Sequence, residues 1–188
     1  MAPDAEDEAT PDRRILHDGP YLRLLSDTVA GPHGPYVYEH IEVPDAVRVV
    51  ALDRDGLLLL VEDDFHLTGR RMPHLPGGGI EPGEEPQAAA RRELEEETGW
   101  RAATWRPLGL IHPLPSSTGA ATHLFLAADL APGRVARDPT ESAMTVHRIA
   151  PADAVARVRA GEITEAGSVA ALLLAAPVLV YGGVGLRG

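Results

Sequence analysis

Four glutamates crowd into one short segment of the chain, between Glu93 and Glu97. Within a helix, Glu93, Glu96 and Glu97 stand at positions i, i+3 and i+4, so their carboxylates share one face. Like charges at this spacing repel one another, and the C-terminal end of a helix is itself negative. The segment therefore requires something positive among the three carboxylates.

Two sources of positive charge are open. In the first, Arg92 reaches Glu96 and Arg91 reaches Glu95, each four residues along, which makes an ordinary solvated charged face. In the second, a hard divalent cation binds the carboxylates, because Mg²⁺ takes oxygen ligands, typically one or two carboxylates with water and substrate phosphates. Three consecutive glycines, residues 77–79, stand upstream and allow close backbone approach with accessible carbonyl oxygens. They favour the metal site.

The spacing resembles the signature of the Nudix hydrolases, G-x5-E-x7-R-E-U-x-E-E-x-G-U, where U is a bulky apolar residue. Every position is matched, by Gly78, Glu84, Arg92, Glu93, Leu94, Glu96, Glu97, Gly99 and Trp100. The signature has seven fixed letters, each with a frequency of roughly one in ten. The probability of a chance match is therefore on the order of 10⁻⁷ per starting point. Trp100 is bulkier than the usual aliphatic residue, a departure that concerns packing.

The resemblance implies a role for each matched residue. The metal ligands would be three carboxylates and one backbone carbonyl, from Glu93, Glu96, Glu97 and Gly77. Arg92 and Glu84 would pair to orient the helix and the loop before it. Mg²⁺, with Mn²⁺ as a second choice, would neutralise a diphosphate, lower the pKa of an attacking water and stabilise the leaving phosphate oxygen.

The resemblance covers most of residues 20–175 and is closest to the ADP-ribose pyrophosphatase branch. It rests on the paired strands of residues 21–43, on Pro115 and on the sequence GEITEAGSVAALLLA near the end. Two positions depart from that branch, because Phe65 and His74 stand where it often has Arg and Glu. We expect Phe65, His74 and Pro115 to contact the substrate, and ADP-ribose turnover to be weaker than in typical members.

A late loop often supplies the general base in the resembled family, and Glu141 is the matching candidate. The expected activity is Mg²⁺-dependent hydrolysis of a nucleoside diphosphate linked to another group, most readily ADP-ribose or a related nucleotide sugar. Two alternatives are the same chemistry on nucleoside triphosphates or a non-nucleotide diphosphate, and a sensor that binds a nucleotide without cleaving it.

Strand pairs mixed with helices predict an α/β fold, a Nudix-type α/β/α sandwich with a mixed β-sheet, preceded by an N-terminal β-hairpin. Strands are expected within residues 21–29, 35–43, 46–53, 57–63, 105–114, 121–130 and 143–150. Helices are expected at residues 86–98, 151–161 and 167–176, the last stopped by Pro177. Residues 64–79, rich in Gly, Pro and charge, are expected to form a loop.

These elements divide the chain into four parts. They are a disordered acidic lead (1–14), a hairpin with a role in dimerisation (15–43), a Nudix hydrolase domain (44–177) and a C-terminal tail (178–188). The hairpin's role comes from the resemblance, which implies a homodimer.

Composition excludes several classes of protein. Seventeen basic residues against 28 acidic ones give a net charge of −11, which disfavours nucleic acid and anionic membranes as partners and leaves a small-molecule diphosphate. The absence of cysteine excludes disulfides, zinc thiolates and thiol nucleophiles, and fits a reducing cytoplasm. The most apolar run, residues 169–181, is shorter than the roughly 20 residues that span a bilayer.

Overall fold

The computed structural model describes residues 12–136 and 143–181. The chain forms two compact units. Of the described residues, the smaller unit contains residues 12–43 and Leu114–Ala120, and the larger contains Pro44–Pro113 and residues 121–136 and 143–181.

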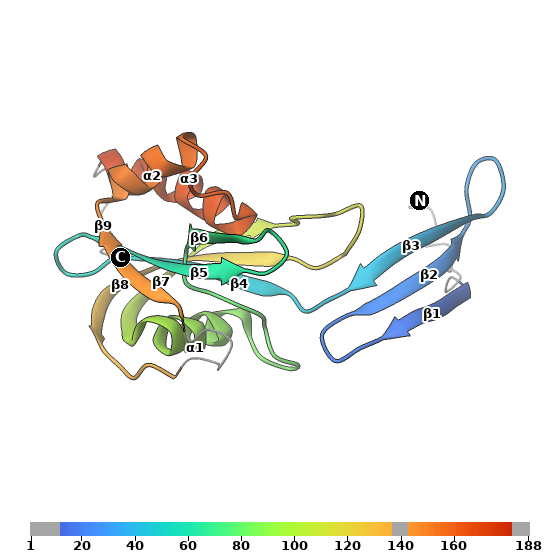
Figure 1. The fold of residues 1–188 in the computed structure, drawn as a ribbon, viewed down its shortest axis with the longest axis horizontal. Helices are drawn as coiled ribbons and strands as arrows, with labels where there is room; N and C mark the ends of the chain where they lie inside the picture. The colour runs from blue at the N-terminus through green and yellow to red at the C-terminus, as the bar shows by residue number, and fades with distance from the viewer. Residues whose placement is uncertain (1–11, 137–142, 182–188) are drawn as a thin grey trace, which may run out of the picture. The chain divides into compact units, whose positions relative to one another are not determined.

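The smaller unit contains a three-stranded antiparallel sheet. Its strands lie in the order β1 (Asp12–Asp18), β2 (Arg23–Val29) and β3 (Tyr36–Glu42) (Figure 1). The pairing of β2 with β3 confirms the expected hairpin. The sequence does not predict β1, because all of its residues are exposed and show no apolar alternation. Residues 12–14 of the expected disordered lead therefore lie in a strand.

Within the described residues, the larger unit has six strands in two three-stranded sheets. The first sheet has the order β4 (Ala46–Ala51), β8 (Thr122–Pro132) and β7 (Trp100–Ile111). The second has the order β6 (Arg70–His74), β5 (Leu58–Phe65) and β9 (Thr145–Ile149). The first sheet is mixed, as expected, because β4 runs parallel to β8 whereas β7 runs antiparallel to it.

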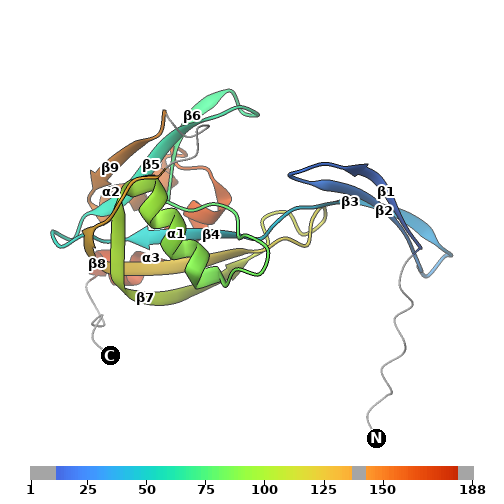
Figure 2. The same cartoon turned by 90° about the horizontal axis from the view of Figure 1, so that it is seen from below.

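Helices cover both faces of these sheets. They are α1 (Pro86–Thr98), α2 (Pro151–Arg159) and α3 (Ala166–Tyr181). In Figures 1 and 2, α1 lies on one side of the strands and α2 and α3 lie on the other. The expected α/β/α arrangement is therefore confirmed. None of the helices in the described part of the chain is long and apolar enough to cross a membrane.

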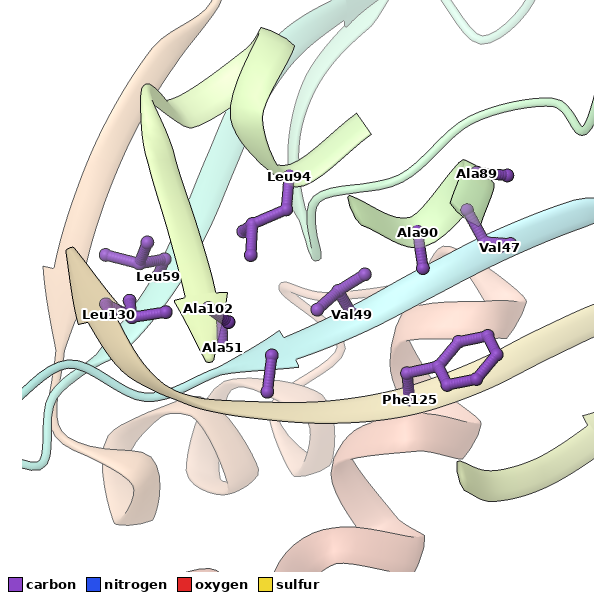
Figure 3. Close-up of a cluster of buried hydrophobic side chains, with 11 residues drawn as sticks. Val47, Val49, Ala51, Leu59, Ala89, Ala90, Leu94, Ala102, Phe125 and Leu130 are labelled. Atoms are coloured by element: carbon purple, nitrogen blue, oxygen red, sulfur yellow. The ribbon is translucent and has the colours of Figure 1, made fainter. Parts of the chain in front are cut away.

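Two buried apolar clusters fill the spaces between the layers, one on the α1 side and one on the α2 and α3 side. Alternation along β4 decides which residue joins which cluster, since Val49 packs toward α1 and Val50 toward α3. Figure 3 shows the first cluster, with Leu94 reaching from α1 toward the sheet. Leu94 thereby fixes α1 against β4.

Two expectations within the larger unit are wrong. β6 is a strand inside the segment expected to be a loop, and it tolerates Pro73 because it lies at the edge of its sheet. Its Met72 and His74 are buried alternately, which is the strand pattern that glycine, proline and charge around it obscure.

The helix α3 continues through Pro177 to Tyr181 instead of stopping there. A proline in a helix removes one backbone hydrogen bond, to the carbonyl four residues earlier, while the next four residues keep their own donors. The first four residues of the expected C-terminal tail are therefore helical.

We predict that Leu94→Ala lowers the free energy of unfolding by about 2–5 kcal/mol, because it leaves a cavity between α1 and the sheet. Urea denaturation with the midpoint and slope fitted separately measures the change. The matched control is Leu67→Ala, since the side chain of Leu67 is 97% exposed, and it should change stability by less than about 0.5 kcal/mol. Equal effects of the two variants would contradict the packing role of Leu94.

Candidate active site

The helix α1 has the predicted bounds, and its local signals explain them. Pro86 occupies the first turn, where its missing N–H costs no hydrogen bond, and Gly99 ends the helix in the left-handed conformation at φ 74°. The buried face of α1 includes two carboxylates as well as apolar side chains. Glu93 is only 8% exposed and Glu97 only 2%. Glu93 and Glu97 therefore do not belong to an ordinary solvated face, although the Arg92–Glu96 pair of the first alternative is present.

Arg92 lies among these carboxylates. Both Glu84 oxygens accept hydrogen bonds from it, at 3.0 Å from Nε and 2.9 Å from Nη2. Its Nη1 donates to Glu93 at 2.8 Å and to Glu96 at 3.2 Å. Its Nη2 also donates to the carbonyl oxygen of Gly79 at 3.0 Å. The expected pair of Arg92 and Glu84 is present, and the same guanidinium ties α1 to the loop before it.

The pairing shifts the titration of both partners. The hydrogen bond from Arg92 lowers the pKa of Glu84 below its ordinary value, although desolvation opposes the change. The hydrogen bond to Glu84 likewise raises the pKa of Arg92. Arg91 and Glu95 do not pair as the first alternative supposes, because Arg91 lies over the ring of Trp105 and Glu95 contacts Arg101.

Gly77 and Gly78 lie against the two buried carboxylates. The N–H of Gly77 donates to Oε2 of Glu97 at 3.0 Å. Gly77 has φ 143°, and a Cβ there would lie 2.1 Å from the carbonyl oxygen of Val47. A Cβ on Gly78 would lie 2.6 Å from Oε1 of Glu93. Gly77 therefore needs to be glycine because its backbone packs against that of Val47, whereas a side chain on Gly78 would require the carboxylate of Glu93 to move.

The carboxylates of α1 and the glycine backbone beside them form a cradle, made of Glu93, Glu96, Glu97, Gly77 and Gly78. The donor atoms of this cradle fit a hard cation. They are carboxylate and carbonyl oxygens, which Mg²⁺ prefers, and one or two carboxylates are enough for it when water and phosphate complete the shell. Among the described residues, no three histidine or acidic side chains lie together closely enough to hold a metal ion. The geometry accounts for this, because Arg92 binds Glu93 and Glu96 while Glu97 bonds to Gly77.

A second ion pair, between Arg48 and Glu165, lies beside the three glycines of residues 77–79, which we call the glycine turn. The sequence analysis does not predict this pair. Nε of Arg48 donates to Oε2 of Glu165 at 3.1 Å. Burial alone would raise the pKa of Glu165, but the charge of Arg48 and hydrogen bonds from Ser168 outweigh it and lower that pKa to about 2. The only signal in the sequence is one arginine within the apolar strand AVRVVA.

Phe65 and His74 lie together, with ring centroids 5.2 Å apart in an edge-to-face arrangement. His74 is 4% exposed, and its Nδ1 lies 3.0 Å from the carbonyl oxygen of Leu75. Within the described residues its Nε2 has no hydrogen-bond partner. Burial, followed by the charge of Arg48, lowers the pKa of His74 below its ordinary value. The pair is thus an uncharged, largely internal contact.

The two remaining predicted residues are Pro115 and Glu141. Pro115 belongs to the smaller unit, where it lines a hollow of about 230 Å³ with Tyr38 and His40. Glu141 lies outside the described residues. Their roles in substrate binding and proton transfer stay predictions.

Known proteins share both the sequence pattern and the fold. Residues 43–166 match the family model of the NUDIX domain. The chain is 35% identical to an ADP-ribose pyrophosphatase of Mycobacterium tuberculosis over 170 residues, 89% of this chain and 82% of that protein. It is 32% identical to a CMP-5'-(N-acetyl-N-hydroxy-3-aminopropyl)phosphonate hydrolase of Streptomyces rubellomurinus, over 85% and 78% of the two chains. The crystal structure of an ADP compounds hydrolase superposes with a TM-score of 0.81 at 26% identity, covering 92% and 94%.

We predict that acid weakens the larger unit partly through Glu165. Its folded-state pKa of about 2 lies below the ordinary 4.5, so its stabilising contribution is present above pH 4.5 and is lost as the pH falls toward 2. Between pH 7 and pH 3 the loss should be on the order of 2 kcal/mol. Urea unfolding at both pH values measures it. Glu165→Gln is the comparison, and an equally large pH dependence in this variant would contradict the assignment.

Proposed function

Because the chain belongs to the Nudix family, we propose that it hydrolyses the diphosphate bond of ADP-ribose or a related nucleotide sugar with the help of Mg²⁺. The chain is a Nudix pyrophosphohydrolase, so the alternative of a sensor without catalysis is set aside. The observation that carries the proposal is the burial of two carboxylates beside a glycine backbone. Such a cradle suits a hard cation and a phosphate better than a structural role.

Each side chain of the cradle has a proposed task. The ligands of Mg²⁺, or of Mn²⁺, would be Glu93, Glu96, Glu97 and the carbonyl of Gly77. When bound, the metal supplies a lower pKa for the attacking water and stabilises the leaving phosphate oxygen. Arg92 holds α1 against the loop before it, because Glu84 accepts two hydrogen bonds from it and the carbonyl of Gly79 accepts a third. Glu141 remains the proposed acceptor of the proton from the attacking water.

The identity of the group attached to the diphosphate is argued from the relatives. The M. tuberculosis relative supports ADP-ribose, and the structural neighbour supports an ADP compound. A relative of similar identity is named for a CMP-linked phosphonate. Phe65 and His74 form an uncharged pair at positions where the resembled branch often has Arg and Glu. A different nucleotide-linked substrate is therefore the second candidate.

The same proposal includes a second copy of the chain and a cytoplasmic location. The smaller unit exposes large apolar side chains on its strands, among them Ile15, Tyr36 and Val37. A homodimer would cover such a surface.

The cytoplasm is proposed because the chain has no cysteine to form a disulfide.

A substrate panel tests the function directly. ADP-ribose, a uridine diphosphate sugar, a nucleoside triphosphate and a non-nucleotide diphosphate are assayed with Mg²⁺ and with Mn²⁺, and the products are separated. We expect the largest kcat/KM for ADP-ribose or another nucleotide sugar, with AMP and a sugar phosphate as products of ADP-ribose. A larger kcat/KM for the triphosphate or the non-nucleotide diphosphate would overturn the substrate assignment.

We further predict that Glu97→Gln keeps the fold but lowers kcat by about 10²–10⁴, because the substitution removes the charge of a metal-binding carboxylate. The amide oxygen of glutamine can still accept the hydrogen bond from Gly77. The matched control is Glu95→Gln on the same helix, whose carboxylate contacts Arg101. Steady-state kinetics and the melting temperature with and without Mg²⁺ are measured for both. Normal turnover in Glu97→Gln would remove Glu97 from the site.

A further inference from the structure

Arg48 reaches the backbone of the glycine turn from within a buried strand. Its side chain is 14% exposed, and the neighbouring residues Val47 and Val49 are fully buried. Nη1 donates to the carbonyl oxygen of Gly77 at 2.6 Å and to that of Val47 at 2.9 Å. A guanidinium desolvated to this degree needs partners with good geometry, and the carbonyl of Gly77 is one of them.

Glu165 fixes the other side of the guanidinium. It precedes α3, and its carboxylate accepts hydrogen bonds from the N–H of Gly167 at 3.0 Å and that of Ser168 at 2.7 Å. This is the arrangement of a helix N-cap, which anchors the carboxylate to the start of α3. A Cβ on Gly167 would lie 2.8 Å from Cγ of Arg48. The arginine therefore has little room to adopt another position.

The backbone of Gly77 is consequently held on both sides. Glu97 of α1 accepts the hydrogen bond of its N–H, and Arg48 of β4 donates to its carbonyl oxygen. A carbonyl oxygen has two lone pairs, so one hydrogen bond leaves capacity for a second partner.

We infer that Arg48 is a positioning residue, which Glu165 holds in place, and that it fixes the direction of the Gly77 carbonyl for metal binding. The inference rests on the proposed function. The guanidinium restricts the Gly77 peptide, while Glu165 balances the positive charge that would otherwise repel the cation. The competing mechanism is that Arg48 occupies the carbonyl and excludes the metal, in which case its removal strengthens metal binding.

Two measurements on Arg48→Met separate these mechanisms. The first is amide hydrogen exchange of residues 75–79 without metal, which should become faster because the Gly77 peptide loses one of its two restraints. The second is Mn²⁺ affinity, measured from the electron paramagnetic resonance of unbound Mn²⁺. Loss of the group that orients a ligand should weaken this affinity by about 10- to 100-fold. The matched control is Arg148→Met, which removes an arginine paired with Asp53 and Asp55 and should change neither quantity.

Glu165→Gln provides a second test, which also serves if Arg48→Met does not fold. It retains the guanidinium but removes its balancing charge, and Mn²⁺ affinity should fall at least about threefold. Rescue by Arg48→Lys should be incomplete, because an ammonium cannot contact Glu165 and Gly77 in the same planar geometry.

The outcomes distinguish this inference from the proposed function. Unchanged hydrogen exchange, or unchanged or tighter Mn²⁺ binding in Arg48→Met, would overturn the positioning role even if the wild-type chain is an active metal-dependent hydrolase. If the wild-type chain neither binds Mn²⁺ nor hydrolyses any substrate of the panel, the proposed function fails and this inference falls with it. Unchanged Mn²⁺ affinity in Glu165→Gln would overturn the part assigned to Glu165.

Discussion

The helix α1 depends on one guanidinium among several carboxylates. Without Arg92, the charges of Glu93 and Glu96 would repel each other near the negative end of the α1 dipole. Arg92 binds both carboxylates and also donates two hydrogen bonds to Glu84. These contacts fix the position of the preceding loop relative to α1. The same contacts mean that any cation approaching Glu93 or Glu96 must compete with a guanidinium already bonded to it. In the proposed metal site, the arginine and the metal would thus share one set of carboxylate oxygens.

Strand alternation explains how two layers of the sandwich meet at one turn. Successive residues of a strand point to opposite faces, so Val47 and Val49 pack toward α1 whereas Arg48 shares the face of Val50, toward α3. Arg48 therefore meets Glu165 at the start of α3, while its guanidinium still reaches the carbonyl of Gly77. The turn lies between this pair and Glu97 of α1. Its geometry consequently depends on both helical layers and not on α1 alone.

The sequence predicts the features whose causes are local. The bounds of α1 follow from Pro86 and Gly99, and the pairing of Arg92 with Glu84 is implied by the resemblance of one motif to the Nudix signature. The sequence does not predict β1, because an exposed strand has no apolar alternation. It does not predict β6, because this segment becomes a strand through its pairing with β5 and not through its composition. Arg48 and Glu165 are 117 residues apart, so no spacing rule connects them. Such a pair becomes visible only when the fold brings β4 and α3 together.

Arg92 and Arg48 already form ion pairs with glutamates, and these ion pairs affect how a diphosphate can be bound. Arg92 and Arg48 both donate to carbonyls of the glycine turn, but each is already neutralised by glutamate. Phe65 and His74 add no charge, since the pKa of His74 is lowered by burial. In the proposed site, a substrate diphosphate beside Glu93 and Glu97 would therefore meet negative charge that these side chains do not offset. Divalent cations would then supply most of the attraction for the diphosphate, and discrimination between substrates would come from contacts with the two groups that the diphosphate links.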